Sequence, residues 1–368
     1  MPHPSRRMSI RSATSALMPL DDALAQLLVA EPVSAIAVPV GDAIGSVLAA
    51  DVVAPADLPT HPRALRDGWA VAGSTVTGAS AYAPVTPLSP PPWLDAGDAM
   101  PPGTDTILPP DAIDTDGDIV ADAAPGAGVV GTGQEIARGD VLARFGERLT
   151  PLGALALSAS GIDTVAVRVP HVHILDIGGH SASTIAAFAK KAGVRVTSSR
   201  CSRERESIAD ALLIPGADAV FVVGGTGFGR NDHSAEALAR RGRLGAHGIA
   251  LRPGDSAGFG SIGSVPVLLL PGRPDAALAT FLALGRPLLA RLSGASLPGR
   301  AKGRLARKMS STIGMSDVVF IGLKNERVEP LGGADLPLRR LIHAWGAVLV
   351  PPEREGYPEG EWIEVMPL

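Results

Sequence analysis

Residues 217–241 read ADAVFVVGGTGFGRNDHSAEALARR, and this stretch decides the fold class. Its first part, Ala219–Val223, is continuously apolar, as expected of a β-strand that is covered on both faces. A G-G-T-G loop interrupts the apolar run, and a segment with helical spacing of apolar residues follows it. Asp232 or Ser234 is a suitable N-cap for that helix. The stretch therefore predicts one strand–loop–helix unit of a parallel α/β sheet.

The same alternation of strands and helices extends over residues 170–295. Gly193 stands where the C′ residue of a helix belongs. We therefore expect one α/β domain with a parallel sheet over this range. The segments that carry the pattern are HVHILDI, SASTIAAFAKKAG, VRVTSS, RESIADALL, ADAVFVV, GIALR, VPVLLL and the apolar helix DAALATFLALGRPLLARL.

The flanking regions have a different character. Residues 1–17 contain arginines among serines and no apolar core of signal-peptide length, which predicts a disordered tail. Residues 18–169 begin with helical spacing at DDALAQLL, capped by Asp21 or Asp22, and a second short helix is plausible at VGDAIGSVLA. Short β segments and Pro or Gly turns follow, which predict an extended β-rich arm. Residues 296–368 return to short strands and predict a small β-barrel or sandwich.

Composition limits the possible partners. The chain has 33 basic and 37 acidic side chains and a formal charge of -4, so no global field attracts nucleic acid or an anionic membrane. No apolar run appears long enough to span a bilayer. The single cysteine, Cys201, cannot form an internal disulfide, which fits a cytoplasmic setting. The arm has few apolar runs, so we expect it to lack a core of its own and to pack against a second subunit in a homodimer.

Four glycine-bearing loops follow predicted strands. Ligands of doubly wound sheets bind beyond the carboxyl ends of the strands, so these loops carry most weight. Glycines let a phosphate approach backbone N–H groups, a helix N-terminus adds partial positive charge, and Arg230 could complete the clamp. The alternative is that the glycines only make tight turns for helix packing. The loops are Gly178–Ser181, Gly224–Gly227, Arg252–Asp255 and Pro271–Pro274.

Several motifs resemble those of one protein family. The G-G-T-G loop, followed by a basic residue and an Asp, resembles the pterin-binding loop of the MogA and MoeA families. RALRDGWA stands in the place of N-S-A-M-D-G-Y-A, and LLPGRPDAA resembles G-L-P-G-N-P-V-S-A. The segments DAMPPGTDTIL, GTGQEIARGD, LRPGDSAGFG and EGYPEGEWIEV resemble further family motifs. The chain is thus similar to the MoeA/gephyrin-E family over roughly residues 18–368.

This resemblance implies a fold and an activity. The fold would be multidomain α/β, with an extended β-rich arm (18–169), a MogA-like molybdopterin-binding α/β domain (170–295) and a C-terminal β-barrel domain (296–368), in an elongated homodimer. The activity would be that of a Mg²⁺-dependent molybdopterin molybdenumtransferase acting on adenylylated molybdopterin. It would serve a molybdoenzyme or another cofactor-biosynthesis protein.

The resemblance also assigns roles to residues. Asp67 and Glu135 would be acids brought by the arm of the other subunit, and Asp232 would be catalytic and would hold Mg²⁺. The remaining candidates would contact the cofactor: Gly178, Gly179, Gly224, Gly225, Thr226, Gly227, Arg230, Arg252, Asp255, Pro271, Gly272 and Arg273.

Some family positions are changed in this chain. Gly179 and His180 replace two carboxylates of the T-G-D-E-L motif, and Asp255 replaces the Lys of P-G-K-P. The charge reversal predicts weak molybdate binding. Three functions are then possible for the chain. It could be an active insertase, a scaffold or cofactor carrier without turnover, or an enzyme that acts on another phosphate ester. A new metal site at His180, His233 and Asp255 is a further alternative, although such side chains on loops are usually only solvated.

Overall fold

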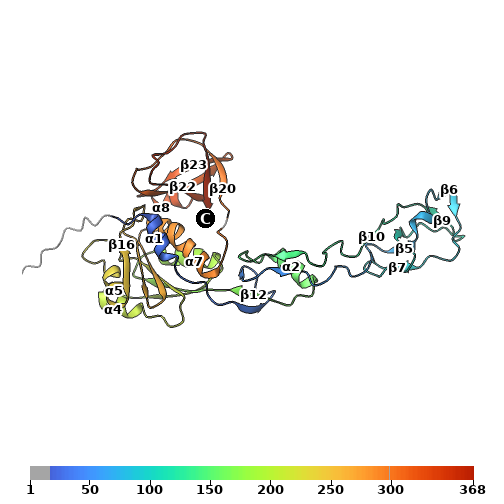
Figure 1. Ribbon diagram of the computed structural model, residues 1–368. Helices are drawn as coiled ribbons and strands as arrows, with labels where there is room; N and C mark the ends of the chain where they lie inside the picture. The colour runs from blue at the N-terminus through green and yellow to red at the C-terminus, as the bar shows by residue number, and fades with distance from the viewer. Residues whose placement is uncertain (1–16, 298) are drawn as a thin grey trace, which may run out of the picture.

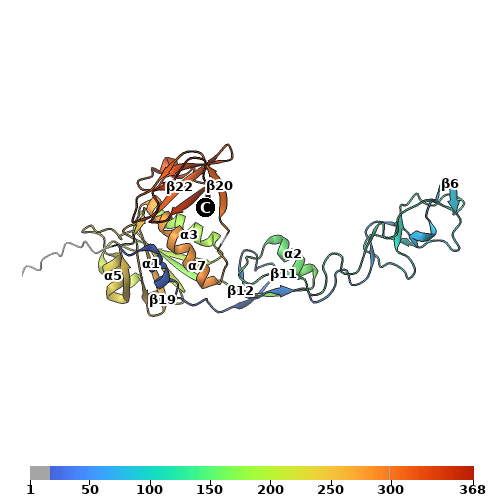
Figure 2. The ribbon, with the colours of Figure 1, turned by 45° about the horizontal axis from the view of Figure 1, so that its top comes forward.

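The structure is a computed structural model that describes residues 17–297 and 299–368 (Figure 1). The tail expected at 1–17 therefore lies outside the described residues except for its last position. Figure 1 shows an α/β body with a β-barrel beside it and a long arm that projects away from both. Figure 2 shows the same separation of arm and body from a second direction.

A six-stranded sheet forms the centre of the α/β body. Its strand order is β14-β13-β15-β19-β18-β16, and every strand except β18 runs in the same direction. The expected parallel sheet is therefore confirmed for β14, β13, β15 and β19, whereas β18 and β16, which join the sheet through antiparallel pairs, were not among the expected strands. The strands are β13 (His171–Asp176), β14 (Arg195–Arg200), β15 (Ala219–Val223), β16 (Arg243–His247), β18 (Gly258–Ile262) and β19 (Val265–Leu270).

Helices cover both faces of this sheet. One face, with Val172, Phe221 and Leu268, packs against α1, α3 and the long α6–α7 helix. The opposite face, with Val220 and Leu269, packs against α4 and α5. These helices are α1 (Leu20–Leu27), α3 (Ser181–Lys191), α4 (Arg205–Ala211), α5 (Ser234–Arg241), α6 (Pro274–Thr280), the π-helical η2 (Phe281–Gly285) and α7 (Arg286–Ser293).

The helix from Pro274 to Ser293 is continuous over 20 residues and is long and apolar enough to cross a membrane. However, 78% of its apolar window is buried inside the protein. Its apolar composition is explained by its position in the core beside the sheet.

The segment GIALR does not belong to the α/β sheet. Strand β17 (Leu251–Arg252) pairs in parallel with β22 (Ser316–Lys324) of the C-terminal domain. The expectation of a sheet strand here was wrong, because a strand this short has no periodicity that reveals its partner.

The C-terminal residues form the expected β-barrel. Strands β22, β23, β20, β26 and β24 pair in a closed ring around a core that includes Val319, Ile321 and Val365. The remaining elements here are β20 (Ala301–Leu305), β21 (Met309–Ser310), β23 (Arg327–Gly332), α8 (Leu338–Leu341), β24 (Gly346–Val350), β25 (Gly356–Tyr357) and β26 (Trp362–Pro367).

The arm has small hydrophobic clusters of its own. One lies near the body around Leu48 and Leu157, and two lie towards the tip around Val71 and Ile107. The expectation that the arm lacks a core was therefore wrong, since turns bring its short apolar segments together. The segment VGDAIGSVLA forms turns and β2 rather than a helix.

The elements of the arm are mostly short. Its strands are β1 (Ile36–Pro39), β2 (Val47–Leu48), β3 (Val52–Val53), β4 (Arg63–Ala64), β5 (Gly68–Val71), β6 (Ser80–Val85), β7 (Trp93–Leu94), β8 (Thr106–Leu108), β9 (Ile119–Ala121), β10 (Val129–Val130), β11 (Val141–Ala143) and β12 (Thr164–Arg168), with helices η1 (Gly73–Thr75) and α2 (Pro151–Ala159).

Candidate functional site

The four glycine-bearing loops lie at one edge of the sheet. Three of them follow the parallel strands β13, β15 and β19, so their carboxyl ends share that edge. The fourth, Arg252–Asp255, precedes the antiparallel strand β18, whose Gly258 pairs with Leu269 near the end of β19. The antiparallel direction of β18 thus brings its preceding loop to the same edge.

Three of these loops pack backbone against backbone. Ser181 Oγ donates a hydrogen bond to the carbonyl of Gly272 at 2.7 Å. The main chain of Gly272 approaches Gly224 so closely that a Cβ atom on Gly272 would lie 3.5 Å from the Gly224 Cα. A Cβ on Gly224 would in turn lie 3.4 Å from the carbonyl oxygen of Gly178. The three loops therefore form one continuous surface of main chain.

The G-G-T-G loop is closed by the first residue of α5. Ser234 Oγ donates to the carbonyl of Gly224 at 2.8 Å, and Ser234 N donates to that of Gly225 at 2.9 Å. Gly225 has a φ of 64°, and a Cβ there would lie 2.8 Å from Ser234 Oγ, so this position favours glycine. The N-cap of α5 is His233, without a side-chain cap bond. The expectation of a cap by Asp232 or Ser234 was wrong, because the Ser234 side chain closes the loop instead.

Several main-chain amides of these loops have no acceptor within the described part of the chain. They belong to Gly225, Thr226 and Gly227 in one loop and to Gly179 and His180 in another. Grouped N–H donors in glycine-rich turns and at helix N-termini are typical anion sites. The edge therefore has the chemistry to hold a phosphate or another oxyanion.

Two residues expected to contact the ligand, Thr226 and Asp232, also have partners within the protein. The Thr226 side chain is 2% exposed, and its hydroxyl lies 3.4 Å from Ser256 Oγ. This side chain therefore links two loops, and only its main chain is available to a ligand. The carboxylate of Asp232 accepts from Gly229 N at 3.2 Å and remains partly exposed.

Two arginines of the site form ion pairs with aspartates. Arg252 forms an ion pair with the buried Asp317. Arg273 pairs with Asp275 and Asp335, whose hydrogen bonds raise the pKa of the guanidinium above its usual value. Both arginines thus connect the α/β domain with the barrel domain.

Two other arginines of these loops, Arg203 and Arg230, differ from Arg252 and Arg273 in their ion pairing. In the described structure Arg230 forms no ion pair, and the same holds for Arg203. Sequence reasoning missed Arg203, whose guanidinium lies within 3.6 Å of where a Gly178 Cβ would be. Its position could have been inferred, because it lies in the loop that follows β14.

The arm residues lie far from the loops of their own chain. Asp67 accepts a hydrogen bond from Ala96 N at 2.7 Å in the distal part of the arm, close to β5. Glu135 is exposed, and its main-chain N–H donates to the Leu58 carbonyl. Figure 1 shows β5 and β10 at the end of the arm that points away from the α/β body. One chain therefore does not bring Asp67 and Glu135 to Asp232.

The described residues contain no group of three or more His, Cys, Asp or Glu side chains arranged to hold a metal. His180 is an exposed N-cap, His233 lies 3.6 Å from Glu236, and Asp255 is exposed on its loop. These three side chains therefore do not assemble into the alternative metal site. A divalent cation bound mainly by ligand phosphates needs only one or two protein carboxylates.

Comparisons with known proteins agree with this architecture. Residues 18–161 match the family described as MoeA N-terminal region (domain I and II), and residues 175–291 match the probable molybdopterin binding domain. Molybdopterin molybdenumtransferase 2 of Mycobacterium tuberculosis is 29% identical over 326 residues, covering 75% of this chain and 80% of that protein. A Methanocaldococcus jannaschii protein assigned to molybdopterin biosynthesis is 26% identical over 86% of this chain and 87% of its own length.

Solved structures show the same fold. The crystal structure of a molybdopterin biosynthesis moeA protein from Pyrococcus horikoshii superposes with a TM-score of 0.76 at 26% identity. It covers 95% of this chain and 99% of that chain. The likeness therefore includes the arm, the α/β domain and the barrel together.

Proposed function

Because this chain belongs to the MoeA family of molybdenum-cofactor biosynthesis proteins, we propose that its glycine-loop edge binds molybdopterin or adenylylated molybdopterin. The observation that carries the proposal is the group of unpaired amides in the G-G-T-G loop, which faces the same edge as Arg203 and Arg230. A phosphate of the ligand would accept from these amides, and the arginines would neutralise its charge. Transfer of molybdenum to the bound ligand is the reaction that the family resemblance indicates.

Mg²⁺ fits this proposal through Asp232. Magnesium usually binds one or two carboxylates together with substrate phosphates and water. Asp232 is the carboxylate that lies over the G-G-T-G-F-G turn, since its Oδ2 is hydrogen-bonded to Gly229 N. The cation would neutralise charge on the phosphates, while Asp232 would fix its position next to the amides.

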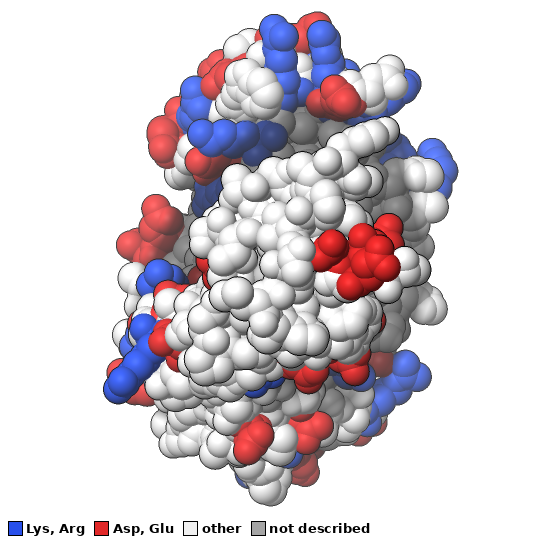
Figure 3. Space-filling view, turned by 90° about the vertical axis from the view of Figure 1, so that its right-hand side faces the viewer, with Lys and Arg blue, Asp and Glu red and all other residues white. Residues whose placement is uncertain are grey.

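We further propose that a second copy of the chain completes the site, in the cytoplasm. Residues 67–122 contain nine aspartates and no Lys, Arg or His, so the distal arm is strongly acidic. Figure 3, which looks at the molecule from the arm's end, shows red groups on an otherwise uncharged surface, with much of the blue on the barrel. An acidic arm complements a loop edge that carries Arg203 and Arg230. Asp67 and Glu135 would reach this edge only from another chain.

A carrier without turnover is the second candidate function. It is favoured by Arg252 and Arg273, which are both held in ion pairs, and by Asp255, which adds negative charge where the family has a cation. Molybdate would then bind poorly, while the pterin would still be held.

One experiment separates the two functions. Purified protein is titrated calorimetrically with molybdopterin and with its adenylate, and AMP release is then followed after adding Mg²⁺ and molybdate. Binding with AMP release supports the transferase, and binding without release supports the carrier. Absence of binding to both ligands would reject the proposed site. Sedimentation of a stable monomer at about micromolar concentration would reject completion by a second copy.

A further inference from the structure

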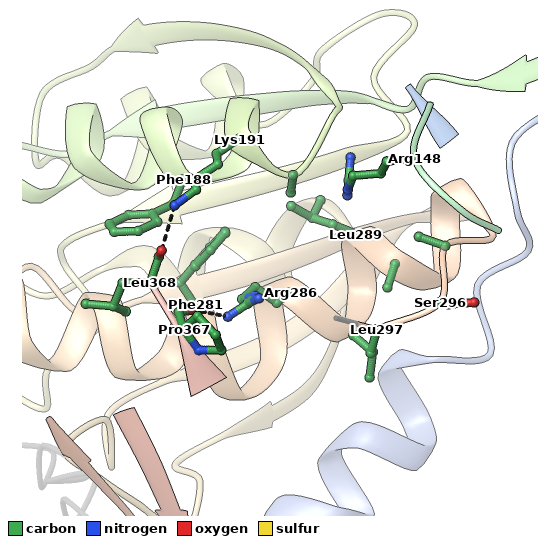
Figure 4. A pocket seen from close by; sticks show the side chains of 13 residues that line it. Arg148, Phe188, Lys191, Phe281, Arg286, Leu289, Ser296, Leu297, Pro367 and Leu368 are labelled. Carbon is green, nitrogen blue, oxygen red and sulfur yellow. Dashed lines mark hydrogen bonds between the residues drawn. The ribbon is translucent and has the colours of Figure 1, made fainter. Parts of the chain in front are cut away.

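A cavity lies at the end of the α/β body opposite the loop edge. Its volume is about 240 Å³, and it is formed where the arm meets α3, the long core helix and the C-terminal segment (Figure 4). The arm contributes Arg148, while α7 contributes Arg286. Lys191 stands at the end of α3, ten residues beyond the loop-edge residue Ser181. None of the residues of the glycine loops lines this cavity.

Two arginines put positive charge into the cavity. Arg148 Nη1 donates to the carbonyl of Gly45 at 3.2 Å, and Arg286 Nη1 donates to that of Pro367 at 2.8 Å. Within the described residues neither guanidinium has a carboxylate partner. Burial lowers the pKa of both groups, and the charge of Arg286 lowers the pKa of Arg148 further. The cavity therefore holds two guanidinium groups that repel each other and that no described side-chain carboxylate neutralises.

Both arginines are fixed by the main chain around them. Arg148 lies directly over Gly193, where a Cβ atom would be 2.0 Å from its Nη1, and Gly193 has a φ of 74°. Arg286 follows the π-helical segment Phe281–Gly285 and precedes Pro287, which lacks an N–H for the helix. π-Helical turns of this kind are frequent at functional sites. The positions of the charges are thus built into the fold.

The walls of the cavity are mainly apolar. Phe188, Phe281, Leu289 and Leu297 line it, and Figure 4 shows Arg286 between Pro367 and Leu289 with Arg148 on the far side of Leu289. The Lys191 ammonium is engaged with the main-chain oxygen of Leu368 at 2.6 Å. An inorganic ion would leave these apolar walls unfilled, whereas an organic anion would cover them.

We propose that this cavity binds a small organic anion, with its carboxylate or phosphate group at Arg148 and Arg286 and its apolar body against Phe188 and Leu297. The ligand would supply the anionic partner that these two arginines lack among the described side chains. Because Arg148 belongs to the arm and Arg286 to the α/β domain, a bound anion would also bridge the arm and the α/β body. This site would regulate the arm's position, independently of pterin binding at the loop edge.

The test uses the full-length protein and three probes: benzoate, phenyl phosphate and inorganic phosphate. Calorimetry should show saturable binding of benzoate and phenyl phosphate, with competition between them, and much weaker binding of inorganic phosphate. Arg148→Gln and Arg286→Gln should each weaken benzoate binding about tenfold or more, because each removes a charge-assisted hydrogen bond. Circular dichroism confirms that each variant is folded.

Two controls make the test specific. Arg291→Gln removes the same charge from the same helix at a residue paired with Glu31, and it should leave benzoate binding unchanged. Arg230→Gln, at the loop edge, should also leave it unchanged, so failure here is distinguishable from failure of the pterin site. No binding of either organic probe at about 1 mM would overturn the proposal. Equal affinity for inorganic phosphate, or equal loss in Arg291→Gln, would overturn it as well.

Discussion

The guanidinium of Arg273 lies 2.7 Å from the carboxylate of Asp275, which is 2% exposed. The same carboxylate accepts from Leu336 N at 3.2 Å, so it connects the P-G-R-P loop to the barrel domain. Arg273 stands where the related family motif has Asn. A residue expected to contact the cofactor is thus also part of the contact between two domains.

Removal of the Asp275 carboxylate should therefore destabilise the protein. We expect Asp275→Ala to lower the free energy of unfolding by about 1–3 kcal/mol, since Leu336 N loses its acceptor and Arg273 loses its buried partner. The half-exposed Arg273 keeps access to water, which limits the cost. Urea denaturation measures the change. Asp210→Ala, in an exposed ion pair with Arg241, is the control and should cost little; equal losses would contradict this reading.

Gly193 should resist substitution. Its left-handed backbone alone costs a residue with a Cβ about 1–2 kcal/mol, and the added atom would overlap Arg148. Gly193→Ala should therefore lower the melting temperature by several degrees. The double variant Gly193→Ala, Arg148→Gln should lose less than the sum of the single variants. Simple additivity would show that the two residues are not in contact.

Acid should destabilise the α/β domain through His173. Its ring bonds to Thr197 Oγ1 at 2.9 Å and to Ser199 Oγ at 2.8 Å, and burial, followed by the charge of His171, lowers the pKa of His173. The unfolded chain then binds more protons than the folded one, so stability is lost as pH falls below about 6.5 towards the lowered pKa.

Denaturation at several pH values measures this dependence. His173→Gln should show a shallower slope between about pH 6.5 and 5, since Gln does not titrate there. His343→Gln, at an exposed position, should keep the slope of the parent protein. An unchanged slope in His173→Gln would assign the pH dependence to other groups.

Asp255 should weaken anion binding at the loop edge. We expect Asp255→Lys to tighten molybdate binding at low salt by about 1 kcal/mol or more, roughly fivefold, because an exposed anion becomes a cation. The gain should shrink as salt rises. Equilibrium dialysis with molybdate measures it. Glu326→Lys, at the exposed turn between β22 and β23, changes the charge equally elsewhere, and a similar gain there would point to a nonspecific effect.

Sequence reasoning anticipated the fold at the level of domains. The buried run Ala219–Val223 and the G-G-T-G loop were sufficient, since a strand covered on both faces has a clear apolar signature. The sequence does not reveal how the short segments pair with one another. Two-residue β17 joined the barrel, and turns gave the arm its small cores.

The sequence predicts which loops form the candidate site, but it does not predict which side chains contact one another there. Chain positions after strands indicate which loops converge. They do not reveal that Thr226 points at Ser256, or that Arg252 is paired with Asp317, because these contacts depend on distant segments. The Arg148–Arg286 cavity was equally hidden, since its two charges lie 138 positions apart in the chain.

Calorimetric titration with molybdopterin tests most directly whether the glycine-loop edge binds this ligand. Parent protein should bind saturably, and Arg203→Gln and Arg230→Gln should each weaken binding about tenfold by removing a charge at the edge. Arg243→Gln, at the opposite end of the sheet where Arg243 pairs with Ser261, should bind like the parent. No binding by the parent, or equal weakening in Arg243→Gln, would contradict the account.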